Sequence, residues 1–266
     1  MRYKRYRGLW ANRMPMSSVA NDPVGPILTL AEALRNGSYR PTPPKCISIA
    51  KANGERRDIK VYMIRDRVAQ RALLQALQAR TDQLMSPFSY GYRPGRGVKD
   101  AVTQAKAFID AGLPWVVDAD IERCFDAIPR QALLKEVAYR LQDTAASDLV
   151  TQYLGWQGDL TEQSIGIPQG SVLAPWLCNI YLWRLDDDMR KQNVSMVRFA
   201  DDFLLMTATR CMAETVKNQC ADLVSTMRLR LNPSKTIVVN AVKPFRFLGQ
   251  WLRTTNLLAA QPLNPE

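Results

Sequence analysis

Val197-Arg198-Phe199-Ala200-Asp201-Asp202-Phe203-Leu204-Leu205-Met206 is the stretch that decides the fold. A hydrophobic strand stops at two adjacent aspartates and resumes beyond them, which predicts a β-hairpin with a carboxylate pair at its tip. Neighbouring carboxylates repel one another, and this raises their pKa unless a cation lies between them. A lone pair of this kind is more often a solvated turn, so a site requires a further acidic group.

That group lies upstream, in Trp115-Val116-Val117-Asp118-Ala119-Asp120-Ile121. The β-branched and aromatic residues of this segment predict a buried strand. Asp118 and Asp120 project from the same face, because side chains alternate along a strand. If the hairpin lies beside this strand, Asp120, Asp201 and Asp202 converge on one point, with Asp118 as a rival to Asp120.

A set of carboxylate ligands without His or Cys suits Mg²⁺ or Mn²⁺ rather than zinc. Two such ions about 3.5–4 Å apart stabilise both the attacking and the leaving oxygen of an in-line phosphoryl displacement. The acidic cluster therefore predicts the chemistry of a nucleotide polymerase.

The residues around both strands resemble the motifs of bacterial reverse transcriptases. The segment 120–128 resembles the first palm motif, and Phe199-Ala200-Asp201-Asp202 resembles the Tyr-Ala-Asp-Asp box with Phe in place of Tyr. Further blocks in the order of the family are 89–97, 166–175 with 179–182, 231–236 and 245–249. The resemblance covers residues from about 35 to 252 and is greatest to group II intron-type enzymes and CRISPR-associated reverse transcriptases.

The resemblance implies an α+β right-hand polymerase fold with an antiparallel palm sheet backed by helices. Residues 1–112 are expected to form basic fingers that bind template and triphosphate, and residues 113–266 the catalytic palm. Only residues 250–266 follow Gly249. Related enzymes continue into a helical thumb, so we expect the thumb to be absent or truncated and a longer chain or a partner protein to supply its grip.

Local patterns predict individual elements of this fold. Asn53-Gly54 predicts a hairpin between residues 47–52 and 55–62, because both turn residues tolerate positive φ. Asp66 is expected to cap a helix that runs to about Thr81. The remaining predicted elements are helices at 98–111, 130–141, from Pro175 and at 212–229, and a strand at 236–242.

The resemblance also implies roles at the carboxylates. Asp120, Asp201 and Asp202 are expected to hold the metal, with Ile121 contributing only its carbonyl oxygen. Lys235 is expected to protonate the leaving pyrophosphate, although a lysine after Asn-Pro-Ser also fits a plain turn.

Other implied roles concern the incoming nucleotide. Lys51 and Arg57 are expected to hold the triphosphate, and Gln169, in a Gly/Pro-rich loop, to lie near base and sugar. Phe125 is expected to lie against the sugar, where its ring would collide with a ribose 2′-hydroxyl. The alternatives are solvated hairpin charges for the two basic residues, a simple turn for Gln169 and core packing for Phe125.

Charge is distributed unevenly along the 266 residues, whose net charge is +11. Residues 1–67 hold 14 Lys/Arg against 5 Asp/Glu, which indicates a track for a nucleic-acid backbone, or more simply a solvated basic face. Arg93 and Arg96 are expected to contact the template. Five cysteines without Cys-x-x-Cys spacing argue against zinc or disulfides and favour the cytoplasm, and no apolar run is long enough for a membrane span.

The sequence therefore predicts an RNA-directed DNA polymerase that uses Mg²⁺, or Mn²⁺, to extend a DNA or RNA primer with dNTPs on an RNA template. The resemblance also suggests spacer acquisition from RNA, with a CRISPR integrase as partner. Alternatives are a group II intron-type reverse transcriptase or maturase fragment, an RNA-dependent RNA polymerase, which Phe125 argues against, and a non-catalytic RNA-binding scaffold, which the three carboxylates argue against.

Overall fold

The computed structural model describes residues 8–12, 14–50, 54, 56–155, 161 and 163–255. The chain divides into two compact units, each drawn from two segments. Unit 1 is Met1–Gln83 with Pro129–Leu177, and unit 2 is Leu84–Ile128 with Cys178–Glu266. The boundary predicted between residues 112 and 113 falls inside unit 2, because the helix before that point packs on the same sheet as the strand after it.

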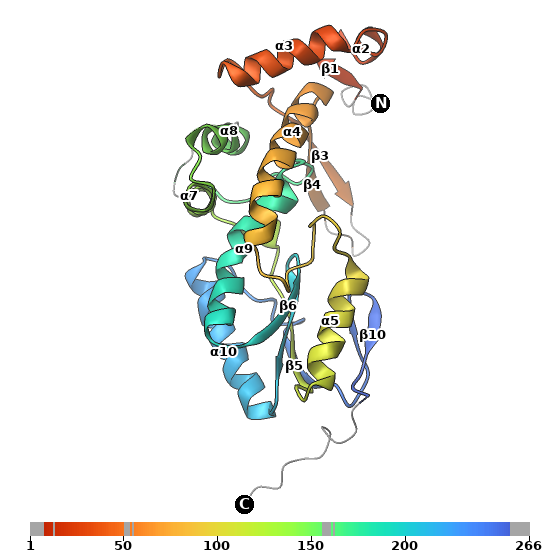
Figure 1. Ribbon diagram of the computed structural model, residues 1–266, viewed down its shortest axis with the longest axis vertical. Coiled ribbons are helices and arrows are strands. Elements are labelled where there is room, and N and C mark those ends of the chain that lie inside the picture. The colour runs from red at the N-terminus through yellow and green to blue at the C-terminus, as the bar shows by residue number, and fades with distance from the viewer. Residues whose placement is uncertain are drawn as a thin grey trace, which may run out of the picture. The chain divides into compact units, whose positions relative to one another are not determined.

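Unit 1 is built from hairpins and helices (Figure 1). Its elements are β1 (Leu9–Ala11), β2 (Met14–Pro15), α2 (Ser17–Ala20), α3 (Val24–Arg35), β3 (Lys45–Ala50), β4 (Arg56–Val61), α4 (Ile64–Thr81), α7 (Arg130–Leu141) and α8 (Thr144–Gly155). The short helix η1 (Asp82–Leu84) follows α4. Strands β3 and β4 form the predicted hairpin, with Ala50 opposite Arg56. No helix among the described residues is both long and apolar enough to cross a membrane.

The prediction that Asp66 caps α4 is wrong. The N-cap position belongs to Met63, which makes no side-chain cap. Asp66 is buried within the first turn, where its carboxylate accepts hydrogen bonds from the Tyr39 hydroxyl at 2.6 Å and from Arg65 Nη2 at 3.2 Å. A tertiary contact therefore uses the side chain that local sequence assigned to a cap.

Unit 2 is built around a four-stranded antiparallel sheet in the order β6-β7-β5-β8. Its elements are α5 (Val98–Asp110), β5 (Trp115–Asp120), α6 (Cys124–Ala127), β6 (Ser195–Phe199), β7 (Asp202–Thr207), α10 (Arg210–Thr226), β8 (Ile237–Asn240), β9 (Phe245–Phe247) and β10 (Gln250–Leu252). Helix α9 (Ala174–Lys191) begins in unit 1 and continues into unit 2. The α+β class with an antiparallel sheet is confirmed.

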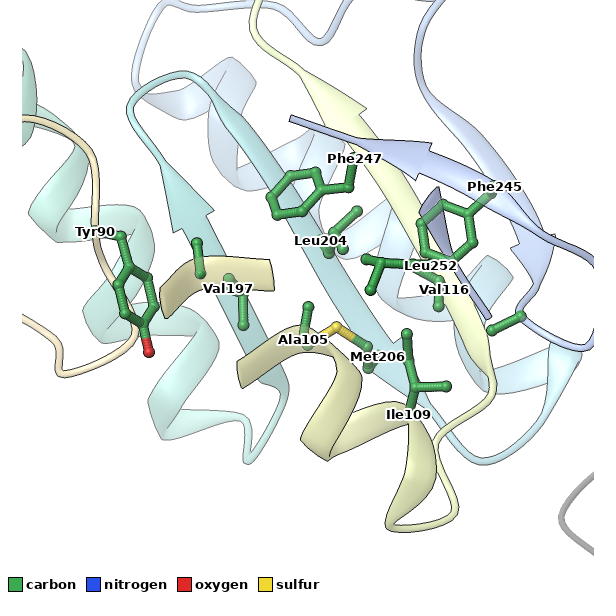
Figure 2. Close-up of a cluster of buried hydrophobic side chains, with 12 residues drawn as sticks. Tyr90, Ala105, Ile109, Val116, Val197, Leu204, Met206, Phe245, Phe247 and Leu252 are labelled. Atoms are coloured by element: carbon green, nitrogen blue, oxygen red, sulfur yellow. The ribbon is translucent and has the colours of Figure 1, made fainter. Parts of the chain in front are cut away.

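One face of this sheet carries the core shown in Figure 2. Val116, Val197 and Leu204 are fully buried there, together with the small residues of α5. Phe245 and Phe247 cover the same cluster from the separate β9–β10 pair. Burial on the scale of about 25 cal/mol per Å² of apolar surface makes this cluster a major source of stability for the sheet.

The opposite face of the sheet is also buried. Val117, Phe203 and Leu205 alternate with the residues of the first core and have no exposed surface. Helix α10, which contacts β5, β7 and β8, lies on this side (Figure 1). Because both faces are covered, the sheet meets solvent mainly at its strand ends, which is where a polar site can be built.

The loop before α5 attaches to the edge strand β6. The Tyr90 N–H donates to the Arg198 carbonyl at 2.8 Å, and the Arg198 N–H donates to the Phe88 carbonyl at 2.9 Å. Gly91 follows, and a Cβ there would lie only 2.4 Å from the backbone nitrogen of Ala200. Only glycine fits this approach, so the loop lies directly against the turn between β6 and β7.

Replacing Gly91 by Ala should therefore destabilise the protein by about 1–3 kcal/mol, the usual cost of overpacking a tight contact. Gly97→Ala is the matched control, because its Cβ would meet nothing closer than Asp100 Oδ2 at 3.7 Å. Denaturant midpoints measure both variants. Equal midpoints for the two would show that the loop does not press on the turn.

Candidate active site

The end of the central strand β5 meets the turn between β6 and β7. Asp120 is the cross-strand partner of Asp202. The next residue, Ile121, donates its N–H to the Asp201 carbonyl at 3.3 Å. Two segments far apart in sequence thus bring Asp120, Asp201 and Asp202 together, at the point where the sequence predicts convergence.

The turn itself contains two residues. Phe199 pairs with Asp202, which leaves Ala200 and Asp201 between the strands. Ala200 has φ +60°, a left-handed conformation that favours glycine in tight hairpins. Such a conformation costs on the order of 1–3 kcal/mol and persists where the surrounding structure fixes it. The turn that presents the aspartates is therefore strained and must be held by its neighbours.

The carboxylates interact strongly with one another. Burial, a hydrogen bond with Asp120 and the negative charges of Asp201 and Asp120 raise the pKa of Asp202 to about 7. Burial and the charge of Asp120 raise the pKa of Asp118 to about 6. Lys235 acts in the opposite direction on both groups. Around neutral pH the cluster therefore retains protons, as acidic groups do where positive charge is in short supply.

Asp120 is held by residues from the loop before β8. The Lys235 ammonium lies 3.0 Å from Asp120 Oδ1, and the Asn232 amide donates to Oδ2 at 3.2 Å. The hydrogen bond with Asp120 is the main cause that raises the pKa of Lys235. Lys235 thus reaches the predicted cluster, and its ammonium lies against Asp120.

The arrangement of these side chains bears on metal binding. Among the described residues, no three His, Cys, Asp or Glu side chains are gathered as a ready-made metal site. Both oxygens of Asp120 already have protein partners. The donor set itself nevertheless fits a hard divalent cation, because it consists of carboxylate oxygens whose mutual repulsion such an ion relieves.

Two of the residues predicted to bind nucleotide lie together in unit 1. Arg57 Nε donates to Gln169 Oε1. The loop that carries Gln169 is fixed on β4, because the Lys60 N–H donates to the Gln169 carbonyl at 2.7 Å. A Cβ at Gly170 would lie 2.3 Å from the Lys60 carbonyl oxygen, so the loop approaches the strand closely. Lys51 lies outside the described residues.

Phe125 lies in the short helix α6 of unit 2 and is half-buried. Its ring meets that of Tyr92 edge to face, with ring centroids 6.3 Å apart and an interplanar angle of 85°. Tyr92 is exposed and has φ +60°. Because part of the Phe125 side chain remains accessible, the ring can meet a ligand as well as pack.

The two arginines predicted to bind template differ. Arg93 is buried, and its Nη1 donates to the carbonyls of Ser86 at 2.6 Å and Ser89 at 2.8 Å. This guanidinium stabilises its own loop, and contact between Arg93 and the template stays a prediction. Arg96 is partly exposed and lies over the ring of Tyr90 at 5.6 Å. Its contact with the template stays a prediction.

Sequence reasoning missed the residues behind the turn. Arg198 lies within the decisive stretch but was treated as part of a hydrophobic strand. It is fully buried and makes an ion pair with Asp186 at 2.6 Å. The available signal was a charge in the middle of an otherwise apolar strand, since such a residue is rarely buried without a partner.

Comparison with known proteins agrees with this geometry. The family model described as "Reverse transcriptase (RNA-dependent DNA polymerase)" matches residues 49–252. The chain belongs to the reverse transcriptase family. It is an enzyme domain of the RNA-directed DNA polymerase class. The six sequence motifs that resemble this family all lie within the matched region.

Individual relatives cover different shares of this reverse transcriptase domain. Protein YkfC of Escherichia coli is 29% identical over 84% of this chain and 70% of its own length. Group II intron-encoded protein LtrA of Lactococcus lactis is 29% identical over 69% of this chain but only 32% of its own length. Telomerase from Candida albicans shares the fold, with a TM-score of 0.65 and 16% identity over 82% of this chain and 45% of its own.

The raised pKa of Asp202 predicts a pH-dependent stability for protein freed of metal with a chelator. The folded state holds this proton more tightly than the unfolded state, so stability is lost as pH rises from about 4 towards about 7. Asp202→Asn, which cannot ionise, should therefore raise the melting temperature at about pH 8 more than at about pH 4.

Adding Mg²⁺ should raise the melting temperature of the wild type at the higher pH and leave that of Asp202→Asn nearly unchanged. An equal gain in melting temperature from Asp202→Asn at both pH values would mean that ionisation of Asp202 does not destabilise the folded protein.

Proposed function

We propose that this chain is a group II intron-type reverse transcriptase that extends a primer 3′-hydroxyl with dNTPs on an RNA template. One observation carries the proposal: Asp120 lies opposite Asp202, with Asp201 in the adjoining turn, at an accessible end of the palm-like sheet. The family match and the intron-encoded relatives support it.

The aspartates give this proposal its chemistry. Asp120, Asp201 and Asp202, with the carbonyl of Ile121, would hold Mg²⁺, or Mn²⁺ in its place. When bound, such ions activate the attacking hydroxyl and stabilise the leaving oxygen of phosphoryl transfer. Lys235 remains protonated beside Asp120, so its Nζ can give a proton to the leaving pyrophosphate.

Residues of unit 1 would bind the triphosphate and the nucleoside. Arg57 is exposed and offers a planar fork of donors that matches phosphate oxygens. Its contact with Gln169 places an amide beside that fork. Lys51 is proposed to act with them as a point charge.

As a functional division, we propose that residues 1–112 are the fingers and residues 113–266 the palm. We also propose that the enzyme acts in the cytoplasm.

The biological process in which the reverse transcriptase acts has several candidates. Intron-encoded relatives favour intron-type reverse transcription, with a maturase fragment as the alternative. Spacer acquisition with a CRISPR integrase, and a partner that replaces the thumb, stay predictions. A non-catalytic RNA-binding scaffold is less favoured, because such a role does not require three carboxylates at one strand end, where the pKa of Asp202 is raised and Asp120 is paired with Lys235.

Asp201→Asn and Asp202→Asn should each lower the rate of primer extension by several orders of magnitude, because each removes a charge that holds the catalytic ions. Asp222→Asn, an exposed acid on α10, serves as the control and should keep its activity. Single-nucleotide incorporation measures the rates. Retention of a tenth of the wild-type rate by either active-site variant would refute the assignment.

Phe125→Ala should relax the preference for deoxyribose, since loss of the ring opens space for a 2′-hydroxyl. The measured quantity is kcat/KM for a dNTP divided by kcat/KM for the matching rNTP. Tyr92→Ala is a useful companion, because it removes the edge-to-face support of the Phe125 ring but not the ring itself. An unchanged ratio in Phe125→Ala would assign Phe125 to the core.

A further inference from the structure

A buried cation lies directly behind the aspartate turn. The side chain of Arg198 is fully buried, and its Nε and Nη2 donate to the two carboxylate oxygens of Asp186, each at 2.6 Å. Its Nη1 donates to the Asn179 side chain at 2.9 Å and to the carbonyl of Ala200 at 3.0 Å. The guanidinium thus links α9 to the strained residue that precedes Asp201.

The ion pair is not explained by stability alone. Removing two charges from water costs several kcal/mol per ion, and well-packed apolar residues often replace such pairs without loss. Although burial by itself lowers the pKa of Arg198, Asp186 raises it, so the guanidinium stays charged. Because Asp186 neutralises that charge, Arg198 does not take the place of a cation at the catalytic carboxylates.

A second contact holds the same turn through the loop that carries Gly91. The Asn179 amide donates to the Gly91 carbonyl at 2.8 Å, and Gly91 lies against the backbone of Ala200. Asn179 therefore connects the guanidinium to the loop that presses on the turn. Ala200 is fixed through its carbonyl by Arg198 and through its nitrogen side by the close approach of Gly91.

We propose that Arg198 is a positioning residue for nucleotide addition: fixed by Asp186 and Asn179, it holds the Ala200 carbonyl and so sets where Asp201 and Asp202 present their carboxylates. This inference rests on the proposed function. It explains why a fully charged side chain occupies the interior of an apolar strand next to a residue with positive φ.

The test compares variants that remove the hold on the turn but not the fold. In Arg198→Met/Asp186→Leu both charges are replaced by apolar side chains, so neither is left buried without a partner. Asn179→Ala removes the link to Gly91 without burying a lone charge. Val197→Ala is the control, because Val197 lies next to Arg198 on β6 but faces the core of Figure 2.

At a temperature where thermal scans show every variant folded, kcat of the double variant should fall about 10²-fold, as for a displacement of about 1 Å at a reacting centre. KM for dNTP should change little, and the Mg²⁺ concentration for half-maximal rate should rise. Mn²⁺ binding, followed by electron paramagnetic resonance without substrate, should weaken in parallel. Asn179→Ala should show the same changes to a smaller degree, and Val197→Ala should lose stability but keep kcat and Mn²⁺ affinity.

The inference is overturned if the double variant and Asn179→Ala keep kcat and Mn²⁺ affinity within about two-fold of the wild type. It is also overturned if Val197→Ala loses both to the same extent, since the effect would then follow stability alone. If the double variant does not fold, Asn179→Ala decides by the same criteria. An inactive wild type would count against the proposed function, and Mn²⁺ binding would still test the role of Arg198.

Discussion

The register between β5 and β7 is the constraint on which the site depends. It places Asp120 opposite Asp202 on the same face, and a slip of one strand by one residue would put the two carboxylates on opposite faces of the sheet. The cores on the two faces fix this register, because Val116 and Val117 each have a buried position to fill. Hydrophobic packing along the strands thus determines where the charges meet at their ends.

The consequence of that register is electrostatic. Burial, together with repulsion among the acids at one strand end, raises the pKa of Asp202 and of Asp118. The ammonium of Lys235 offsets part of the repulsion at Asp120. The repulsion between the aspartates and the strained backbone of Ala200 both destabilise the turn, which the buried Arg198 holds in place. Strain and uncompensated charge at one point of an otherwise well-packed unit are typical of a functional site.

The sequence predicted the features that local patterns encode. The hairpin around Asp201, the strand ending at Asp120 and the pairing of β3 with β4 all formed, because alternation and turn signals specify them within a few positions. Tertiary contacts decided the rest. Asp66 is predicted to cap a helix but is used inside the fold, and Arg93 hydrogen-bonds to carbonyls of its own loop. The partner of Arg198 lies on another element, and neither compact unit is continuous in sequence, so local patterns could not supply them.

The most direct test of the account is primer extension by the wild-type chain on poly(rA)/oligo(dT) with Mg²⁺, comparing dTTP with UTP. The account predicts that dTTP is incorporated, that UTP is strongly disfavoured and that chelation of Mg²⁺ abolishes the reaction. Incorporation of UTP as efficiently as dTTP, or extension that survives chelation, would contradict a deoxynucleotide polymerase built on this cluster of aspartates.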